Sequence, residues 1–196
     1  MKQENLKPVE IPSMEEVTQE RNRLAYQSRY RRILRSTISS LIVVAAIAVL
    51  MATLLFPVLQ VSGDSMEPTL HDRNILLLIK THDLNTGDLC SFSWQNKLLI
   101  KRIIGGPGDV INIDEKGEVS VNGKVLDEPY VDELALGECD LKFPYQVPEN
   151  RYFVLGDHRS VSIDSRSSAI GCIDKKQIVG KVFLRIWPLK DFSIMK

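Results

Sequence analysis

The sequence lacks an excess of charge of either sign. Its 196 residues hold 25 Lys and Arg against 25 Asp and Glu. Nucleic-acid-binding domains carry a basic excess, so we expect no nucleic-acid partner. The glycine-rich patterns that cradle phosphate groups are absent, and the 3 cysteines form no CxxC pair. We therefore expect neither a cofactor nor a cysteine-bound metal ion.

Charge is missing altogether from one long stretch, residues 36–63. This stretch is mostly apolar, and about 20 apolar residues are enough to cross a bilayer as a helix. We expect one transmembrane helix over residues 37–61, with Pro57 at a terminus or a kink near its outer end. A buried helix of a soluble domain is the alternative interpretation.

Basic residues gather immediately before this stretch: Arg29, Arg31, Arg32 and Arg35. The excess of positive charge on the inner side of membrane proteins predicts a cytoplasmic N-terminus. Residues 1–36 are then a cytoplasmic segment that is partly helical, because Ser13 and Glu16 have the spacing of a capping box. No clear cleavage site follows the apolar run, which favours a retained anchor over a secretory signal peptide. The prediction is a single-pass protein of the cell membrane, in contact with the lipid bilayer.

Residues 62–196 lie outside the cytoplasm in this scheme and consist of short, β-rich runs. The predicted strands cover residues 75–80, 89–94, 98–104, 110–113, 118–121, 152–155 and 178–187. Asn122-Gly123 is a strong two-residue hairpin signal, and residues 127–150 form a long excursion between sheet elements. The expected fold class is mainly β, an antiparallel sheet or partly open barrel that follows a cytoplasmic helix and one transmembrane helix.

An extracytoplasmic domain permits disulfide bonds. Cys90 shares a strand face with Phe92 and Trp94, because alternate residues of a strand share a side, and we expect a buried thiol there. Cys139 and Cys172 lie in loop-like surroundings. The sequence is equally compatible with a disulfide between them and with two free thiols.

A serine among small residues and proline follows the predicted membrane span, in the segment 62–70, which reads SGDSMEPTL. Ser65 is a candidate nucleophile, and a linker turn is the alternative. The elbow of α/β-hydrolases is excluded because the second glycine of that motif is missing. A nucleophile needs a base, and the three histidines, His71, His82 and His158, lie in polar loops that make them poor candidates.

A better base lies on the predicted strand 98–104. Lys101 shares a face there with Leu99 and Ile103, and burial among apolar neighbours lowers the pKa of a lysine. The neutral amine can then accept the proton of a serine hydroxyl near pH 7. A solvated strand is the alternative, but Lys101 and Arg102 point to opposite faces, so one of them must meet the sheet interior or a covering segment.

The segment 156–166 concentrates two acids, two arginines and three serines in eleven residues. We expect a rigid polar network that supports a catalytic site from behind. A solvated loop is one alternative. A metal site formed by Asp157, His158 and Asp164 is another.

Taken in order along the chain, these segments resemble the bacterial type I signal peptidases, which are membrane-bound serine proteases. The resemblance rests on residues 62–70, 87–90, 101–109 and 156–166. It implies that Ser65 is the nucleophile that becomes acylated and that Lys101 is the general base. It also implies an all-β scaffold with a shallow apolar groove, which binds the substrate as an extended strand and accepts small side chains.

The resemblance assigns further roles to residues around this pair. Ser162 is expected to hydrogen-bond to Lys101 and orient it, and Met66 and Ile100 are expected to contact the substrate. Four residues are expected to support the loop: Asp157, Arg159, Asp164 and Arg166.

Gly63 is a departure from part of this family. Gram-negative members typically carry a hydroxyl residue there as an oxyanion donor, so the backbone N–H of Ser65 is one expected donor and the second is open. Gly63 and the single span make the chain resemble the Gram-positive branch.

Such an enzyme cleaves N-terminal signal peptides from exported preproteins, which are the expected partners. Two alternatives share most of these residues. One is a dedicated peptidase that processes pilin or another exported subunit, and the other is an extracellular assembly module that has lost catalysis.

Overall fold

The computed structural model of the chain describes residues 13–81 and 83–195. The chain divides into two units, Met1–Ala52 and Thr53–Lys196. The described part of the first unit is helical, and the regular secondary structure of the second unit is mostly strands, joined by long loops. The first twelve residues of the predicted cytoplasmic segment, and His82, lie outside the described residues.

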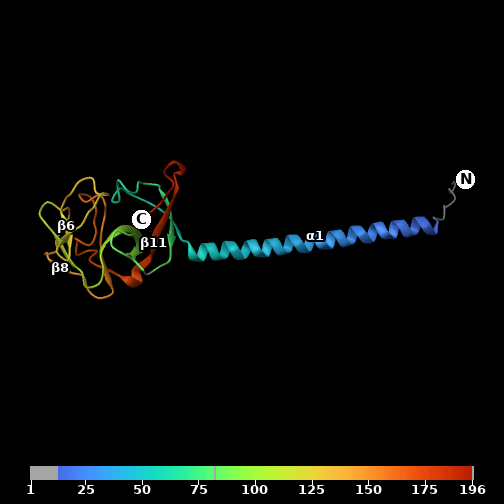
Figure 1. Ribbon diagram of the computed structural model, residues 1–196, viewed down its shortest axis with the longest axis horizontal. Helices are drawn as coiled ribbons and strands as arrows, with labels where there is room; N and C mark the ends of the chain where they lie inside the picture. The colour runs from blue at the N-terminus through green and yellow to red at the C-terminus, as the bar shows by residue number, and fades with distance from the viewer. Residues whose placement is uncertain (1–12, 82, 196) are drawn as a thin grey trace, which may run out of the picture. The chain divides into compact units, whose positions relative to one another are not determined.

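Helix α1, Met14–Leu55, runs over 42 residues without a break (Figure 1). The predicted capping box opens it: the N–H of Ser13 donates to Oε2 of Glu16 at 2.9 Å, and the N–H of Glu16 donates to Oγ of Ser13 at 3.3 Å. The helix ends at Leu55 and not at residue 61. Pro57 explains the earlier end, because proline cannot continue a helix and disfavours the helical conformation of the residue before it.

The second half of α1 is the apolar part of the chain. Within the described residues, α1 is the one helix long and apolar enough to cross a membrane, with a mean hydropathy of 2.7 in its apolar window. Residues 36–55 carry no charge. At a rise of about 1.5 Å per residue they span roughly 30 Å, which matches the hydrocarbon core of a bilayer.

The strand unit contains a larger sheet of eight strands, all paired antiparallel, in the order β1-β2-β11-β3-β4-β9-β10, with β12 paired to β11. Its strands are β1 Val58–Gln60, β2 Ile75–Ile79, β3 Leu89–Trp94, β4 Lys97–Gly105, β9 Arg151–Leu155, β10 Ile173–Asp174, β11 Ile178–Trp187 and β12 Ser193–Ile194. Two short 3-10 helices, η1 Lys175–Gln177 and η2 Leu189–Asp191, flank β11.

The smaller sheet has four antiparallel strands in the order β7-β6-β5-β8. They are β5 Val110–Ile113, β6 Val119–Val121, β7 Lys124–Val125 and β8 Tyr145–Gln146. The predicted turn joins β6 to β7, and Asn122 and Gly123 both have the positive φ, 53° and 80°, that a type I′ hairpin requires.

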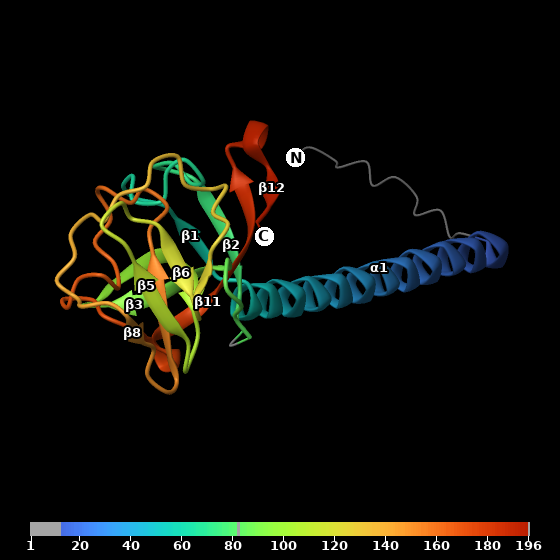
Figure 2. The same cartoon turned by 60° about the vertical axis from the view of Figure 1, so that its left-hand side comes forward.

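The two sheets share an apolar cluster, and Figure 2 shows β5, β6 and β8 gathered in one part of the strand unit. Residues from both sheets pack together in this cluster, among them Ile104, Phe153 and Leu155 of the larger sheet and Ile111 and Val119 of the smaller. Since β4 and β9 contribute to this cluster, the smaller sheet stabilises the strand that carries Lys101.

The prediction of a mainly β domain is confirmed, and every predicted strand overlaps an observed one. Five strands were not predicted: β1, β7, β8, β10 and β12. Each has only two or three residues, too few for the alternation of apolar and polar residues that identifies a strand. Neither sheet closes into a barrel within the described residues.

All three cysteines fall in the described part of the chain, and each is a free thiol. The disulfide between Cys139 and Cys172 that the sequence left open is therefore not formed. Cys90 packs in an apolar cluster with Phe92 and Ile103, as its strand position predicts. Burial raises the pKa of the Cys90 thiol to about 12, so this thiol is unreactive at neutral pH.

Apolar side chains on both sides of Ser65 fix its segment to the larger sheet. Val61, Met66 and Leu70 are buried there against residues of β2, β3 and β11. The N–H of Val61 also donates to O of Asn74 at 2.8 Å. The short turn between Val61 and Met66 consequently has little freedom to move.

Candidate active site

The two residues that the sequence singled out as nucleophile and base lie in contact. Ser65 follows β1 and Lys101 lies in the middle of β4. Nζ of Lys101 donates a hydrogen bond to Oγ of Ser65 over 2.6 Å. When the amine is neutral, the same contact allows the hydroxyl proton to pass to the amine.

The surroundings of Lys101 favour that neutral form. Its side chain is only 3% exposed, which excludes the solvated strand considered above. Burial lowers the pKa of Lys101 from 10.5 to about 8, while the Asp164 carboxylate opposes this shift and the Arg166 guanidinium reinforces it. With that pKa, about a tenth of the molecules carry the neutral amine at pH 7.

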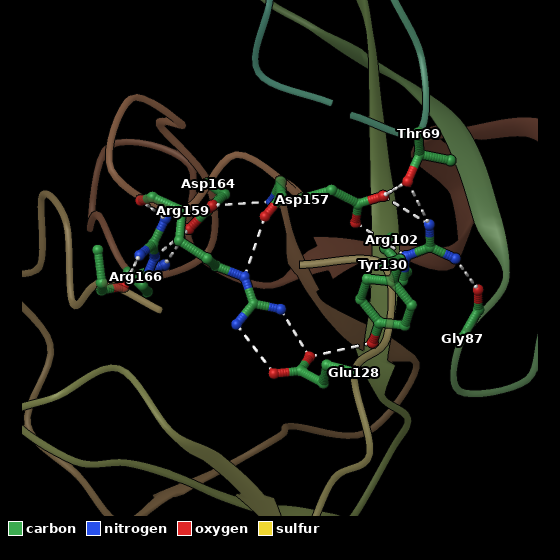
Figure 3. Close-up of polar contacts among 11 residues, drawn as sticks. Thr69, Gly87, Arg102, Glu128, Tyr130, Asp157, Arg159, Asp164 and Arg166 are labelled. Atoms are coloured by element: carbon green, nitrogen blue, oxygen red, sulfur yellow. Dashed lines mark hydrogen bonds and ion pairs between the residues drawn. The ribbon is translucent and has the colours of Figure 1, made fainter. Parts of the chain in front are cut away.

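Arg102 lies on the opposite face of β4 and is also buried. Figure 3 shows its guanidinium facing the Asp157 carboxylate, with Nε at 2.8 Å from Oδ1 and Nη2 at 2.5 Å from Oδ2. Oγ1 of Thr69 donates to the same carboxylate at 2.5 Å, and Nη1 donates to O of Gly87 at 2.8 Å. The guanidinium also stacks on the ring of Tyr130, 3.8 Å from its centroid.

A second buried ion pair joins Arg159 to Glu128. Nη1 and Nη2 of Arg159 donate to the two carboxylate oxygens at 3.0 and 2.6 Å, and the hydroxyl of Tyr130 donates to Oε1 at 3.0 Å (Figure 3). Tyr130 therefore links the two ion pairs, because its ring stacks on Arg102 and its hydroxyl donates to Glu128, the partner of Arg159.

A third pair lies within the loop itself. Nε and Nη2 of Arg166 donate to Oδ1 and Oδ2 of Asp164, both at 2.8 Å, and Oδ2 also accepts from the N–H of Gly156 at 3.0 Å. Nη1 of Arg166 reaches O of Leu136 at 2.7 Å. The acids and arginines of the loop therefore form a buried, paired network, as predicted, although Ser160, Val161 and Ile163 are exposed.

The metal site considered for Asp157, His158 and Asp164 has no support in this geometry. Both carboxylates face arginines, which compete with any cation. Among the described residues, no group of three or more His, Cys, Asp or Glu side chains is arranged to hold a metal ion.

A cavity of about 90 Å³ opens beside Ser65 and Lys101. Its lining consists of residues 60–63, Ser65, Met66 and 98–101. Met66 is buried and Ile100 half-buried. Both predicted substrate contacts therefore belong to the lining and make part of it apolar.

Gly63 borders this cavity with a backbone φ of 92°, a conformation that favours glycine. Its N–H donates to Oδ1 of Asp72 at 3.1 Å. A Cβ at Gly63 would meet no heavy atom within 4 Å beyond its chain neighbours. The space into which a side chain at position 63 would point is therefore open.

Ser162 is buried, but its contacts differ from those expected. Within residues 13–81 and 83–195, no group forms a hydrogen bond with its Oγ, so the expected bond to Lys101 is not formed. Ser162 packs instead against Gly156, where a Cβ would lie 2.2 Å from Oγ of Ser162 and 2.5 Å from O of Ser65. Only glycine fits at position 156, because Ser162 and the carbonyl oxygen of Ser65 occupy the space that a Cβ would need.

Comparison with known proteins identifies the family. The family model described as "Signal peptidase, peptidase S26" matches residues 34–187. The chain belongs to this signal peptidase family.

Individual relatives agree with the family match. Signal peptidase I of Bacillus amyloliquefaciens is 35% identical over 171 residues, which cover 80% of this chain and 90% of that protein. Signal peptidase IB of Staphylococcus aureus is 37% identical over 153 residues, covering 68% and 78%. A crystal structure of a signal peptidase I from Enterococcus faecalis is 26% identical, covers 50% of this chain and 96% of that one, and gives a TM-score of 0.42.

Membership of the signal peptidase family confirms the resemblance seen in the sequence. The relatives carry signal peptidase names, so neither a dedicated subunit-processing enzyme nor a silent assembly module is favoured.

Glu128 and Tyr130, which lie in the excursion 127–150, were not among the residues predicted from the sequence. Local patterns do not reveal which distant side chain such residues meet. A count of charges would have helped, because the loop and its neighbouring strand carry three arginines that need buried partners and the loop supplies two acids. The third acid is Glu128.

Proposed function

We propose that this chain is a membrane-bound serine endopeptidase that cleaves signal peptides from exported preproteins, with Ser65 as nucleophile and Lys101 as general base. One observation carries the assignment: the buried amine of Lys101 lies 2.6 Å from the hydroxyl of Ser65. The family membership supports the reaction class, because the relatives are named signal peptidases.

The reaction begins with the neutral Lys101 amine. It removes the hydroxyl proton as Oγ of Ser65 attacks the scissile carbonyl, and the carbonyl oxygen gains the negative charge. The backbone N–H of Ser65 donates to this oxyanion. The protonated Lys101 then gives its proton to the leaving amine, which departs as the new N-terminus of the mature protein.

The acyl-enzyme that remains is an ester between Ser65 and the signal peptide. Lys101, again neutral, takes a proton from a water molecule that attacks this ester. The released peptide carries the new carboxyl group, and Ser65 regains its proton from Lys101. One residue thus acts as base and acid in both halves of the reaction.

The free side of β4 supports binding of the substrate as an extended strand. In the described structure, β9 pairs with β4 only at residues 102–105, whereas β3 pairs along residues 97–102 on the other side. Unpaired backbone groups before Lys101 can therefore pair with a peptide strand. The small cavity beside Met66 and Ile100 favours a small side chain next to the bond that is cut.

Helix α1 supports a single-pass topology with residues 1–36 in the cytoplasm and the catalytic domain outside. A spanning segment of residues 37–55 replaces the longer one expected from the sequence, and residues 62–196 form the catalytic domain. A signal peptide is itself an apolar helix in the same bilayer. Ser65 follows the end of α1 by ten residues, so the connecting chain spans at most about 36 Å.

The test is cleavage of a preprotein by the full chain in detergent or lipid. Ser65→Ala and Lys101→Ala should each reduce kcat/KM by at least about 10³-fold, because each removes a participant in the chemistry. Ser93→Ala and Lys97→Ala are matched controls at exposed positions of β3 and β4 and should cleave normally. Cleavage by Ser65→Ala at the parental rate would falsify the assignment.

A further inference from the structure

The peptide group between Asp64 and Ser65 has a donor end and an acceptor end, and each has a hydrogen-bonding role. Its N–H, on Ser65, is the oxyanion donor of the proposed mechanism. Its carbonyl oxygen, O of Asp64, accepts from the N–H of Glu67 at 3.0 Å and from Nδ1 of His158 at 3.3 Å. Hydrogen bonds to the carbonyl end fix the plane of the peptide and polarise its N–H end.

His158 also holds the next peptide group. Its backbone N–H donates to O of Ser65 at 3.2 Å. The ring contact must be a donated hydrogen bond, because a carbonyl oxygen can only accept, and the ring proton therefore lies on Nδ1. One residue thus holds the carbonyl groups on both sides of the Ser65 α-carbon.

The position of His158 is itself fixed by its neighbours. Asp157 is bound to Arg102 and Arg159 to Glu128 by the buried ion pairs described above. O of His158 accepts from the N–H of Ser162 at 3.1 Å. A donor held in this way loses little conformational entropy when it binds the Asp64 carbonyl.

The residue at position 63 determines how much stabilisation of the oxyanion the Ser65 N–H must provide. Gly63 has no side-chain hydroxyl to donate to an oxyanion, so more depends on the Ser65 N–H. We propose that His158 is a positioning residue, whose Nδ1–H bond to O of Asp64 directs and polarises the Ser65 N–H toward the developing oxyanion. This inference rests on the proposed function and adds a residue to it.

Two substitutions at His158 separate the hydrogen bond from the bulk of the side chain. His158→Asn places an amide donor close to the position of Nδ1, whereas His158→Leu has nearly the shape of asparagine and no donor. We expect His158→Leu to lower kcat about tenfold with little change in KM, and His158→Asn to stay within about twofold of the parent. His71→Leu, at an exposed histidine, is the matched control and should keep the parental rate.

A second readout follows the oxyanion directly. A peptide boronate forms a tetrahedral adduct on Ser65 and should bind His158→Leu about tenfold more weakly, while an uncleavable peptide of the same sequence binds unchanged. A merely structural role of His158 would weaken both ligands or neither. If His158→Leu does not fold, as judged by thermal unfolding, His158→Ala takes its place in the comparison.

The inference is overturned if the Leu and Asn variants have equal kcat and equal boronate affinity. This outcome is distinct from failure of the proposed function. In the first case the parent still cleaves and Ser65→Ala does not, whereas in the second case Ser65→Ala cleaves as well.

Discussion

The protein around Lys101 disfavours the charged form of its amine. Its amine is buried in β4 next to a hydroxyl, and no carboxylate within the described residues forms an ion pair with it. Of the three acids that oppose the shift, Asp64, Asp157 and Asp164, the last two are bound to arginines. Pairing these two acids with arginines weakens their effect on the lysine, and desolvation then dominates the pKa.

The lowered pKa of Lys101, about 8, predicts the pH dependence of cleavage. The active form is the neutral amine, so kcat/KM should rise with pH up to about 8 and level off above it. The measurement is the initial rate at low substrate concentration from pH 6 to pH 10, together with a check that the protein stays folded. A profile that is flat through this range contradicts a lysine base.

The same pKa predicts an effect on stability. Between about pH 8 and pH 10.5 the unfolded chain holds a proton on Lys101 that the folded chain has lost. The contribution of this residue to the free energy of unfolding therefore rises with pH through that window, and its penalty is largest below pH 8. Lys101→Met removes the penalty and should be more stable than the parent at pH 7 by roughly 1 to 3 kcal/mol.

Denaturant unfolding of the full chain at pH 7 and pH 10.5 measures this effect. The advantage of Lys101→Met should shrink at the higher pH, because the folded lysine is then neutral and about half of the unfolded chains have also lost the Lys101 proton, which removes most of the penalty. Equal stability of the two proteins at pH 7 would mean that burial does not penalise the ammonium form.

The sequence predicts the orientations of some of these side chains but not their partners. Alternation along one strand predicts that Lys101 and Arg102 face opposite ways, and both turn out to be buried. The partner of each is not predictable from local pattern, because Ser65 and Asp157 lie 36 and 55 residues away. The sequence also could not predict that Oγ of Ser162 finds no hydrogen-bond partner among the described residues, since this depends on its packing against Gly156.

At the scale of the elements, the loop at residues 156–166 is unusual because buried ion pairs stabilise it. It contains no helix or strand. Three buried ion pairs, and not an apolar core, fix its conformation. Such pairs fix geometry more than they add stability, because desolvation offsets much of their attraction. The loop can therefore hold the backbone of Ser65 in one arrangement.

Removing one member of such a pair should have a large effect. Glu128→Gln leaves the buried guanidinium of Arg159 without an opposite charge, and we expect a loss of roughly 2 to 4 kcal/mol in the free energy of unfolding. Arg73→Gln is the control, because its ion pair with Asp72 is exposed and 3.5 Å long, and should lose less than about 1 kcal/mol. Similar losses in the two variants would show that the buried network does not stabilise the fold.

Element boundaries show what the sequence can and cannot specify. The hydropathy pattern predicts an apolar helix, but it cannot tell helix from strand over the last residues of the run. Val58 and Leu59 are as apolar as the residues of the helix before them and nevertheless belong to β1, because their backbone pairs with β2. Pro57 is the local signal that separates the two.

At the scale of the whole molecule, the proposed function requires the catalytic domain to lie outside the cytoplasm. The four arginines before the apolar stretch predict a cytoplasmic N-terminus. In sealed vesicles with the outer face exposed, an added protease should leave an N-terminal tag intact, and detergent should make the tag susceptible. Loss of the tag from intact vesicles would reverse the proposed topology.

The most direct test of the central claim is to locate the residue that is acylated. The full chain is incubated with a serine-directed acylating inhibitor, and mass spectrometry maps the adduct in the parent and in Lys101→Met. We expect an adduct on Ser65 in the parent and little or none in the variant over the same time. An adduct on another residue, or equally fast modification of Ser65 without Lys101, would contradict the central claim.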